Sequence, residues 1–303
     1  MMNKNFVTGK RGFVYLTRRS IQKLFGRVIP NELMSRFYYR LVLKKKLDLK
    51  NPKTFNEKLQ WYKLVYCPNN PLVIQCSDKY KVRQYVIERG LGQYLVPLLG
   101  VWNNPDEIEW NTLPEQFVLK GNHGCAYNII CRDKETLDVS LMIKYMKCWL
   151  KEDFGLFNIE PHYDYIDKKI ICEEYIQTRD GSMPDDIKIY FFSGVPKLIL
   201  VATEREKKLK LTFFDTGWNM LNIGKHENAS GIEKPKLLDE AIEIATKLAG
   251  DFPFVRVDLY DCNNQIILGE LSFTPAAGIA AYYTEEGDRI VGDMFDLPKT
   301  FYK

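Results

Sequence analysis

Several common kinds of functional site have no counterpart in this sequence. Its three histidines, at positions 123, 162 and 226, are too scattered to suggest a metal cluster. Its seven cysteines are an odd number and include no C-x-x-C pair, which argues against structural zinc and for reduced thiols in a cytoplasmic protein. No Ser-His-Asp or Cys-His signature is present, so nothing points to catalysis through a protein nucleophile.

Long apolar segments are missing as well. No uninterrupted apolar run approaches the roughly 18 residues that span a membrane. The first residues, MMNKNFVTGKRG, carry charge but no apolar stretch or cleavage site, so we expect no signal peptide. The sequence also lacks internal repeats, low-complexity segments and any recognisable nucleic-acid module. These absences favour a folded, cytoplasmic chain that does not bind nucleic acid.

The charge that is present is distributed unevenly. Residues 1–63 contain 16 Lys and Arg against 3 Asp and Glu, a balance of +13, and the rest of the chain carries −9. Apolar residues recur in this basic segment at helical spacing, at positions 21, 24, 25, 28, 34, 37, 38, 41 and 42. Such a stripe either packs on its own domain or lies on anionic lipid. Peripheral contact with the inner face of a membrane is therefore one partner that the pattern allows.

The order of the patterns predicts an α+β chain in three parts. Helical signals dominate residues 1–95 and end at the Gly stop of KYKVRQYVIERGLG. Residues 96–177 indicate a small α/β unit, with a strand–loop–strand at 117–133, a helix and then the strand KKIICEEYI. Residues 178–303 indicate a larger unit, with a hairpin that turns at Ser193 and Gly194, the helix LLDEAIEIATKLAG and a final hairpin.

The final hairpin, FVRVDLYDCNNQIILGELSFTP, carries charges among apolar residues. Side chains alternate between the two faces of a strand, so Arg256 and Asp258 share one face. With a turn near Asn264, Asp258 is expected almost opposite Glu270. Alternation on the returning strand predicts one set of side chains on a common face: Ile266, Leu268, Glu270 and Ser272.

Two carboxylates opposite each other destabilise a sheet unless something pairs with them. A Mg²⁺-bound phosphate would meet this need, because Mg²⁺ prefers hard oxygen ligands and Arg256 would neutralise phosphate charge. A solvated sheet face, on which the same charges are simply exposed, is the alternative that the hairpin alone leaves open.

Other charged residues are informative only in combination. Lys120 ends the apolar strand FVLK and enters the loop GNHGCAYN, whose backbone N–H groups could wrap a phosphate, although this is not a Walker A loop. Lys79 and Arg83 open an earlier helix. Glu173 ends a buried strand, and Lys188 alternates with apolar residues in DDIKIYF. Taken singly, each of them indicates helix capping or an exposed charge.

In this order the elements resemble the ATP-grasp superfamily and, more narrowly, the TupA-like ATP-grasp family. The similarity lies in TFNEKLQW, DKYKVRQYV, LPEQFVLKGNHG, IICEEYI and GELSFTPAAG. That family is associated with the assembly of bacterial cell-surface polysaccharide and teichuronopeptide. The resemblance implies an ATP-grasp fold, in which two α/β subdomains clamp ATP behind a mainly helical, basic N-terminal region. The central subdomain would carry a glycine flap, and the C-terminal one a Mg²⁺-binding hairpin.

The resemblance also implies which residues hold the nucleotide: Lys79, Lys120, Gly121, His123, Gly124, Glu173, Ile176, Asp180 and Lys188. The first two lysines would bind the α- and β-phosphates under a flap of residues 121–126. Glu173 and the backbone of Ile176 would contact adenine, and Asp180 would bind the ribose.

The remaining roles concern phosphoryl transfer and the metal. Lys188 would lie near the γ-phosphate and Arg256 near the transferred phosphoryl group, which makes them the catalytic candidates. Asp258 and Glu270 would bind Mg²⁺. Many ATP-grasp enzymes have Asn where this chain has Ser272, a weaker ligand that leaves the second metal site in question.

The activity implied is a carboxylate–amine ligase that works through an acyl phosphate on a surface glycan or its precursor, for example by joining an amino acid to a uronic acid. A sugar kinase on the same ATP site is the main alternative. A glycosyltransferase is less favoured, because Asp185 and Asp186 are a poor substitute for a D-x-D motif. A non-catalytic nucleotide-binding module stays open because of Ser272.

Overall fold

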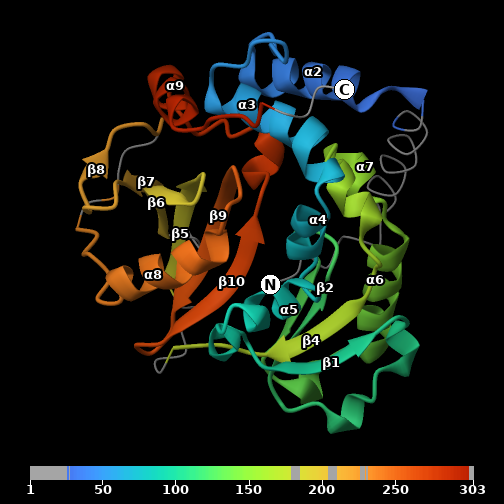
Figure 1. Ribbon diagram of the computed structural model, residues 1–303. Helices are drawn as coiled ribbons and strands as arrows, with labels where there is room; N and C mark the ends of the chain where they lie inside the picture. The colour runs from blue at the N-terminus through green and yellow to red at the C-terminus, as the bar shows by residue number, and fades with distance from the viewer. Residues whose placement is uncertain are drawn as a thin grey trace.

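The computed structural model describes residues 26, 28–178, 185–203, 210–225, 229 and 231–299. Within these ranges the chain forms a four-stranded and a six-stranded sheet, both antiparallel, with helices around and between them (Figure 1). Its helices are α2 (Asn31–Leu43), α3 (Phe55–Trp61), α4 (Pro71–Ser77), α5 (Val82–Glu88), α6 (Val139–Lys151), α7 (Phe154–Asn158), α8 (Leu238–Ala249) and α9 (Glu285–Asp293). Its strands are β1 (Leu98–Trp102), β2 (Phe117–Gly121), β3 (Asn128–Cys131), β4 (Ile170–Glu174), β5 (Asp185–Phe192), β6 (Val195–Thr203), β7 (Lys210–Phe214), β8 (Met220–Leu221), β9 (Phe254–Asp261) and β10 (Ile266–Ser272).

The smaller sheet has the strand order β1-β4-β2-β3. Its apolar side chains, among them Leu119 and Cys172, form one core with Tyr145, Met146 and Trp149 of helix α6. Helix α6 begins at Asp138, whose side chain accepts a hydrogen bond from Leu141 N. The predicted strand–loop–strand, the helix after it and the strand around residue 172 are all confirmed.

The larger sheet has the order β10-β9-β5-β6-β7-β8, and helix α8 packs against it (Figure 1). Both predicted hairpins are confirmed. Ser193 and Gly194 form the first turn with positive φ angles of 50° and 76°. The apolar side chains of α8, at positions 238, 241, 244, 245 and 248, are buried in the core of this sheet.

Residues far ahead of this sheet in the sequence complete its core. The ring of Phe55 in α3 contacts a set of aromatic rings from the C-terminal part of the chain: Tyr190, Phe192, Phe254, Tyr283 and Phe295. Helix α3 begins at a capping box between Thr54 and Glu57. In α5 the Tyr85 hydroxyl donates to Leu248 O at 2.8 Å. The proposed boundaries at residues 95 and 177 stay predictions.

The last hairpin pairs as predicted where its charges lie, but not along its whole length. Glu270 lies opposite Asp258, and Ser272 lies opposite Arg256. A bulge between Leu268 and Glu270 then shifts the register, so that Leu268 pairs with Leu259 on the other face. The prediction that Leu268 shares a face with Glu270 is therefore wrong, because the extra residue at Gly269 reverses the alternation.

Helix α2 leaves apolar side chains in solvent. Leu33, Phe37 and Leu41 are 56%, 60% and 51% exposed, and they follow one another at intervals of four residues along one face. The part of the basic segment before residue 26 lies outside the described residues. Among the helices of the described ranges, none combines the length and the apolarity needed to cross a bilayer.

Two histidines are buried in the fold. His123 is 1% exposed and donates from Nε2 to Trp149 O at 2.9 Å. His162 is equally buried, and neither of its ring nitrogens has a hydrogen-bond partner within the described ranges. Burial lowers the pKa of His123 to about 4 and that of His162 to about 3, so both rings are neutral at pH 7.

Helix α9 holds α3 in place through a close backbone approach and polar contacts. Asp288 accepts hydrogen bonds from both the backbone and the side chain of Asn56, and Lys58 Nζ donates to Gly292 O at 2.9 Å. A Cβ on Gly292 would lie 2.4 Å from Lys53 O, closer than real Cβ atoms approach a backbone atom. Glycine is therefore required at this crossing.

We expect Gly292→Ala to lower the free energy of unfolding by roughly 1–3 kcal/mol, because backbone on both sides must move apart. Urea denaturation of the purified protein measures this change. Gly92→Ala is the matched control, since its Cβ would meet its nearest neighbour at an ordinary 3.4 Å. Equal losses in the two variants would contradict the proposed crowding between α9 and α3.

We also expect acid to destabilise the fold through His123 and His162. In the unfolded chain a histidine takes up a proton below about pH 6.5, whereas the folded rings resist protonation until about pH 4 and about pH 3. The contribution of these two histidines to the free energy of unfolding is therefore fully present above about pH 6.5. It declines as the pH falls, by roughly 2 kcal/mol per histidine at about pH 5. Urea denaturation at about pH 7.5 and about pH 5 should show a smaller difference in His123→Gln and His162→Leu than in the wild type. An unchanged difference in both variants would refute this source of acid sensitivity.

Candidate functional site

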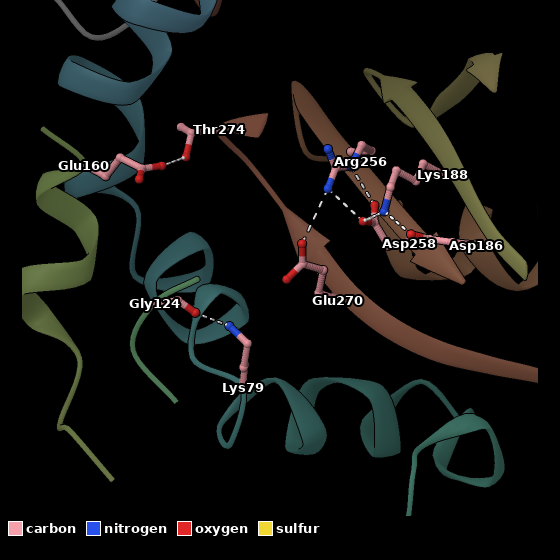
Figure 2. Close-up of polar contacts among 9 residues, drawn as sticks. All are labelled: Lys79, Gly124, Glu160, Asp186, Lys188, Arg256, Asp258, Glu270 and Thr274. Carbon is pink, nitrogen blue, oxygen red and sulfur yellow. Dashed lines mark hydrogen bonds and ion pairs between the residues drawn. The ribbon is translucent and has the colours of Figure 1, made fainter. Parts of the chain in front are cut away.

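Asp258 is the centre of a charged network on the larger sheet (Figure 2). Its side chain is 4% exposed, so these charges do not lie on a solvated face. Asp258 Oδ2 accepts from Lys188 Nζ at 2.6 Å and from Arg256 Nη2 at 2.7 Å, and its Oδ1 accepts from Arg256 Nε at 2.6 Å. Sheet register brings the three together, because Lys188 on β5 lies directly opposite Asp258 on β9. The contact between Arg256 and Asp258 agrees with the expectation that they share one face of their strand, whereas the pairing of Lys188 with Asp258 was not predicted.

Both cations of the network stay charged. Burial, the largest influence, lowers the pKa of Lys188, but Asp258 and Asp186 together outweigh it and the pKa is raised. Burial also opposes the charge on Arg256, and Asp258 again raises the pKa above its usual value. Lys188 additionally pairs with Asp186 at 2.6 Å, a residue not included in the predicted site. Two carboxylates therefore balance the two cations, and of these residues Arg256 is the one that lines a pocket.

Glu270 differs from Asp258 in its exposure. Its side chain is 42% exposed, and Arg256 Nη2 donates to its Oε1 at 3.4 Å. Figure 2 shows this carboxylate pointing away from the sheet, toward the side of Lys79. Glu270 is thus the acid of the hairpin that is open to a ligand, whereas Asp258 is held by its two cations.

A second group of charges lies at the smaller sheet. Lys120 Nζ pairs with Glu173 Oε2 at 2.6 Å, and Arg83 Nη1 pairs with Glu173 Oε1 at 3.2 Å. Strand register places Lys120 and Glu173 on neighbouring strands, since β2 pairs with β4. Arg83 is only 15% exposed, so the prediction of a surface charge at that position is wrong. Its helix faces the cleft rather than solvent.

The glycine loop after β2 is fastened to the turn before α5. Lys79 N donates to Asn122 O at 3.0 Å, and the Asn122 side chain donates to Asp78 Oδ1 at 2.8 Å. Lys79 Nζ in turn donates to Gly124 O (Figure 2). Asn122 is fully buried, so it fixes the loop relative to Lys79. The sequence pattern indicates the glycines on either side of Asn122, but it does not predict that Asn122 fixes the loop.

Two adjoining pockets join these groups into one cleft. The first is lined by Arg83, Lys120 and Glu173, and the second by Arg256, Ser272 and the flap. Four residues line both pockets: Lys79, Tyr163, Glu270 and Leu271. The cleft therefore runs between the two sheets.

Some predicted site residues are placed elsewhere or are not described. His123 is buried behind the loop against Trp149 and does not line either pocket. Gly121 is the last residue of β2, and its N–H donates to Tyr127 O inside the sheet. Ile176 is half-buried just beyond β4 and lines neither pocket. Asp180 lies outside the described residues.

The second pocket contains residues that the sequence did not single out. Glu160, between α7 and the short helix Pro161–Tyr165, lines it and accepts a hydrogen bond from Thr274 Oγ1. Lys63, 1% exposed, donates to Ala277 O from behind the pocket wall at 2.8 Å. Neither residue belongs to a periodic pattern or a glycine loop, and no sequence signal distinguishes them from ordinary charges.

The last hairpin can hold a metal ion only if its side chains supply suitable oxygen ligands. Within the described ranges, no group of three or more His, Cys, Asp or Glu side chains is arranged to hold a metal ion. Mg²⁺, however, is commonly bound through one or two carboxylates together with substrate phosphates. Glu270, open to the cleft, supplies one such carboxylate, and Asp258 beside it would supply a second only by giving up contacts with Arg256 and Lys188. The hairpin thus fits Mg²⁺ that arrives with a phosphate and is held mainly by Glu270.

Solved structures with a similar chain path are distant. The D-alanine–D-alanine ligase of Helicobacter pylori is 13% identical over 82% of this chain and 68% of its own, with a TM-score of 0.44. The ADP complex of purK, an N5-carboxyaminoimidazole ribonucleotide synthetase, is 13% identical over 71% of this chain and 49% of its own, with a TM-score of 0.45. N5-carboxyaminoimidazole synthase from Aspergillus clavatus is 12% identical over 66% and 45%, with a TM-score of 0.41. This chain thus spans about half the length of the last two proteins.

The sequence itself gives the stronger result. No curated protein matches it. Residues 57–296, however, match the family described as TupA-like ATPgrasp, and this span includes both sheets, the glycine loop and the charged hairpin. The match covers most of the chain and agrees with the two-sheet architecture and the lysine-lined cleft. The chain belongs to the TupA-like ATP-grasp family.

Proposed function

We propose that this chain is an ATP- and Mg²⁺-dependent ligase that joins a carboxylate to an amine through an acyl phosphate. The observation that carries the proposal is the continuous cleft. Lys79 and Glu270 line both of its pockets, so a triphosphate bound along them would extend from Lys120 at one end to Arg256 at the other. Enough of the second pocket remains beyond Arg256 for an acceptor.

The fixed positive charges supply the electrostatic part of the chemistry. A carboxylate oxygen of the acceptor attacks the γ-phosphorus, the bond to the β–γ bridging oxygen breaks, and ADP leaves. Lys188 and Arg256 stabilise the negative charge on the transferred group, and they need no rearrangement because Asp258 already orients both. An amine nitrogen then attacks the acyl carbon, phosphate leaves, and the nitrogen loses a proton to give the amide.

Mg²⁺ would be held by Glu270 and Asp258, with Ser272 as a weaker neighbour, and when bound it would supply charge neutralisation at the phosphates. The chain's own contribution is positioning. Lys79 is anchored to the flap through Gly124, and the flap can exclude water from the acyl phosphate. Glu173, with Lys120 and Arg83, would mark the adenine end of the cleft.

The family's association with surface polysaccharide favours a uronic acid or another acidic sugar as the carboxylate, and an amino acid as the amine. A sugar kinase would use the same ATP site but would leave phosphate on the sugar. We place the ligase first because the second pocket contains a buried carboxylate, Glu160, in addition to the cationic Arg256. A cleft with both signs of charge suits two acceptors of opposite charge.

The test measures ATP·Mg²⁺ binding by calorimetry and ADP release with glucuronic acid and each standard amino acid. We expect binding by the wild type and a loss of its Mg²⁺ dependence in Glu270→Gln, because this carboxylate is open to the cleft. ADP release should require both acceptors and fall by roughly 100-fold or more in the variant. ADP release with the sugar alone, with phosphate retained on it, would overturn the ligase in favour of the kinase.

Control variants separate site effects from folding. Asp258→Asn is expected to lose Mg²⁺ dependence too, but it removes the counter-ion that Lys188 and Arg256 share and leaves them only Asp186 and Glu270, a change that can cost up to about 3–5 kcal/mol of stability. Its melting curve must therefore be compared before its binding is interpreted. Glu243→Gln, on the exposed face of α8, removes a carboxylate outside the cleft and should bind ATP·Mg²⁺ as the wild type does. Wild-type protein that ignores ATP·Mg²⁺ would refute the proposal.

We further propose that the basic N-terminal segment contacts an anionic membrane, where a lipid-linked glycan precursor would be found. Leu33, Phe37 and Leu41 of α2 are exposed on one face, and Arg40 and residues 44–46 add positive charge at the same helix. Basic residues near an anionic surface contribute about 1 kcal/mol each, and apolar side chains add to this on insertion.

We expect the double variant Phe37→Glu, Leu41→Glu to bind phosphatidylglycerol-rich vesicles at least tenfold more weakly than the wild type, because it removes apolar area and adds negative charge. Vesicle sedimentation measures this binding, with phosphatidylcholine vesicles as the uncharged comparison. Ile290→Glu, at another exposed apolar residue, is the control and should bind as the wild type does. Equal sedimentation of all three proteins would refute a membrane contact through α2.

A further inference from the structure

Glu160 is a buried carboxylate at the end of the cleft farthest from the adenine side. It is 6% exposed and lines the second pocket together with Arg256 and Ser272. Figure 2 shows its side chain turned toward Thr274, on the opposite side of the drawn space from Arg256 and Asp258. The pocket therefore has Arg256 with its neighbour Glu270 on the larger sheet and the carboxylate of Glu160 on the other side.

The charge of Glu160 is incompletely compensated. Within the described residues its carboxylate accepts one hydrogen bond, from the neutral hydroxyl of Thr274. Lys63 acts on it electrostatically, but the Lys63 ammonium donates to Ala277 O and makes no ion pair with Glu160. Burial raises the pKa of Glu160 to about 7, which reflects the same shortage of partners. A buried carboxylate in this situation is stabilised by a further N–H donor or cation.

The wall next to Glu160 is strained and firmly supported. Ala276 and Ala277 have positive φ angles of 53° and 51°, a conformation that costs a non-glycine residue roughly 1–2 kcal/mol. Gln60 Nε2 donates to Ala277 O at 3.1 Å and to Gly278 O at 2.8 Å, which holds the segment from behind. Strain maintained by buried contacts is typical of segments that position a ligand.

Arg256 and Glu160 lie on different sides of the pocket and can sort the two acceptors by charge. A carboxylate acceptor would be attracted by Arg256 and Lys79 and repelled by Glu160, while Glu270 would be occupied by the metal ion. An amine would be attracted by Glu160, and from there its nitrogen could reach an acyl phosphate formed near Arg256. A sugar hydroxyl has no need of a buried anion, so this wall favours an amine over a second sugar.

We propose that Glu160 is the amine-binding residue of the cleft and that the second substrate is a primary amine, such as the α-amino group of an amino acid, recognised through N–H···O hydrogen bonds to this carboxylate. This inference rests on the ligase function proposed above. Thr274 orients the carboxylate, and Gln60 and Lys63 fix the loop beside it. In the step that follows, the C–N bond forms as the bond from the acyl carbon to the phosphate oxygen breaks, and the proton of the amine passes to solvent.

The experiment measures binding of the standard amino acids and ethanolamine to the wild-type protein and to Glu160→Gln, with and without ADP·Mg²⁺, by calorimetry. We expect at least one amine to bind the wild type and to bind the variant roughly tenfold or more weakly, with ATP·Mg²⁺ affinity changed less than about threefold. The N-acetyl derivative of that amine has no cationic group and should not bind the wild type. If Glu160→Gln melts at a much lower temperature, Glu160→Asp keeps the charge and should show an intermediate loss.

Other outcomes overturn the inference without ambiguity. Equal binding of the amine to the wild type and Glu160→Gln, or equal binding of the N-acetyl derivative, would show that Glu160 does not recognise the amine. A parallel loss of ATP·Mg²⁺ affinity would assign Glu160 a structural role. Absence of binding by any amine in the panel would also refute it. The ligase function fails separately, through loss of ATP·Mg²⁺ binding or through sugar-only turnover in the wild type.

Discussion

The neutralisation of Asp258 is the interaction on which this site depends. A buried carboxylate in the middle of a sheet is costly unless it is paired, and here two cations from two adjacent strands surround it. Asp258 in turn offsets the free-energy cost of burying Lys188 and Arg256 in low-dielectric surroundings. The result is a rigid, charge-balanced network from which Arg256 lines the cleft. Glu270, outside this balance, is left free to face the cleft.

The parts of the site that sequence could predict are those created by local periodicity. Alternation along two consecutive strands is sufficient to place Asp258 opposite Glu270, and a lysine after an apolar strand is sufficient to locate the glycine loop. The bulge at Gly269 could not be predicted, because a single inserted residue has no periodic signature and the flanking Leu268 is apolar in either register. The resemblance to a family supplied most of the residue roles; local patterns alone left each charge ambiguous.

The site residues that the sequence did not predict lie in loops or come from a distant part of the chain. Glu160 and Asn122 act from loops, where side-chain direction depends on the tertiary path and not on a repeat. Lys63 and Gln60 come from the helical segment early in the chain, more than 200 positions before the loop that they support. The early helices therefore support the wall of the second pocket, which agrees with a family match that begins at residue 57.

Helices α4 and α5 restrict how the two sheets can move relative to each other. Tyr85 ties α5 to the end of α8, Arg83 ties it to β4, and the Asp78 turn is bound to the loop after β2 through Asn122. The pair thus acts as a wedge fastened to both sheets, and a hinge that swung one sheet away from the other would have to break one set of these bonds. Access for substrates is expected instead from the flap around Gly124, which can lift on its own when the hydrogen bond from Lys79 to the Gly124 carbonyl opens. The flap would then close again over the bound nucleotide, and the scaffold on either side would stay still.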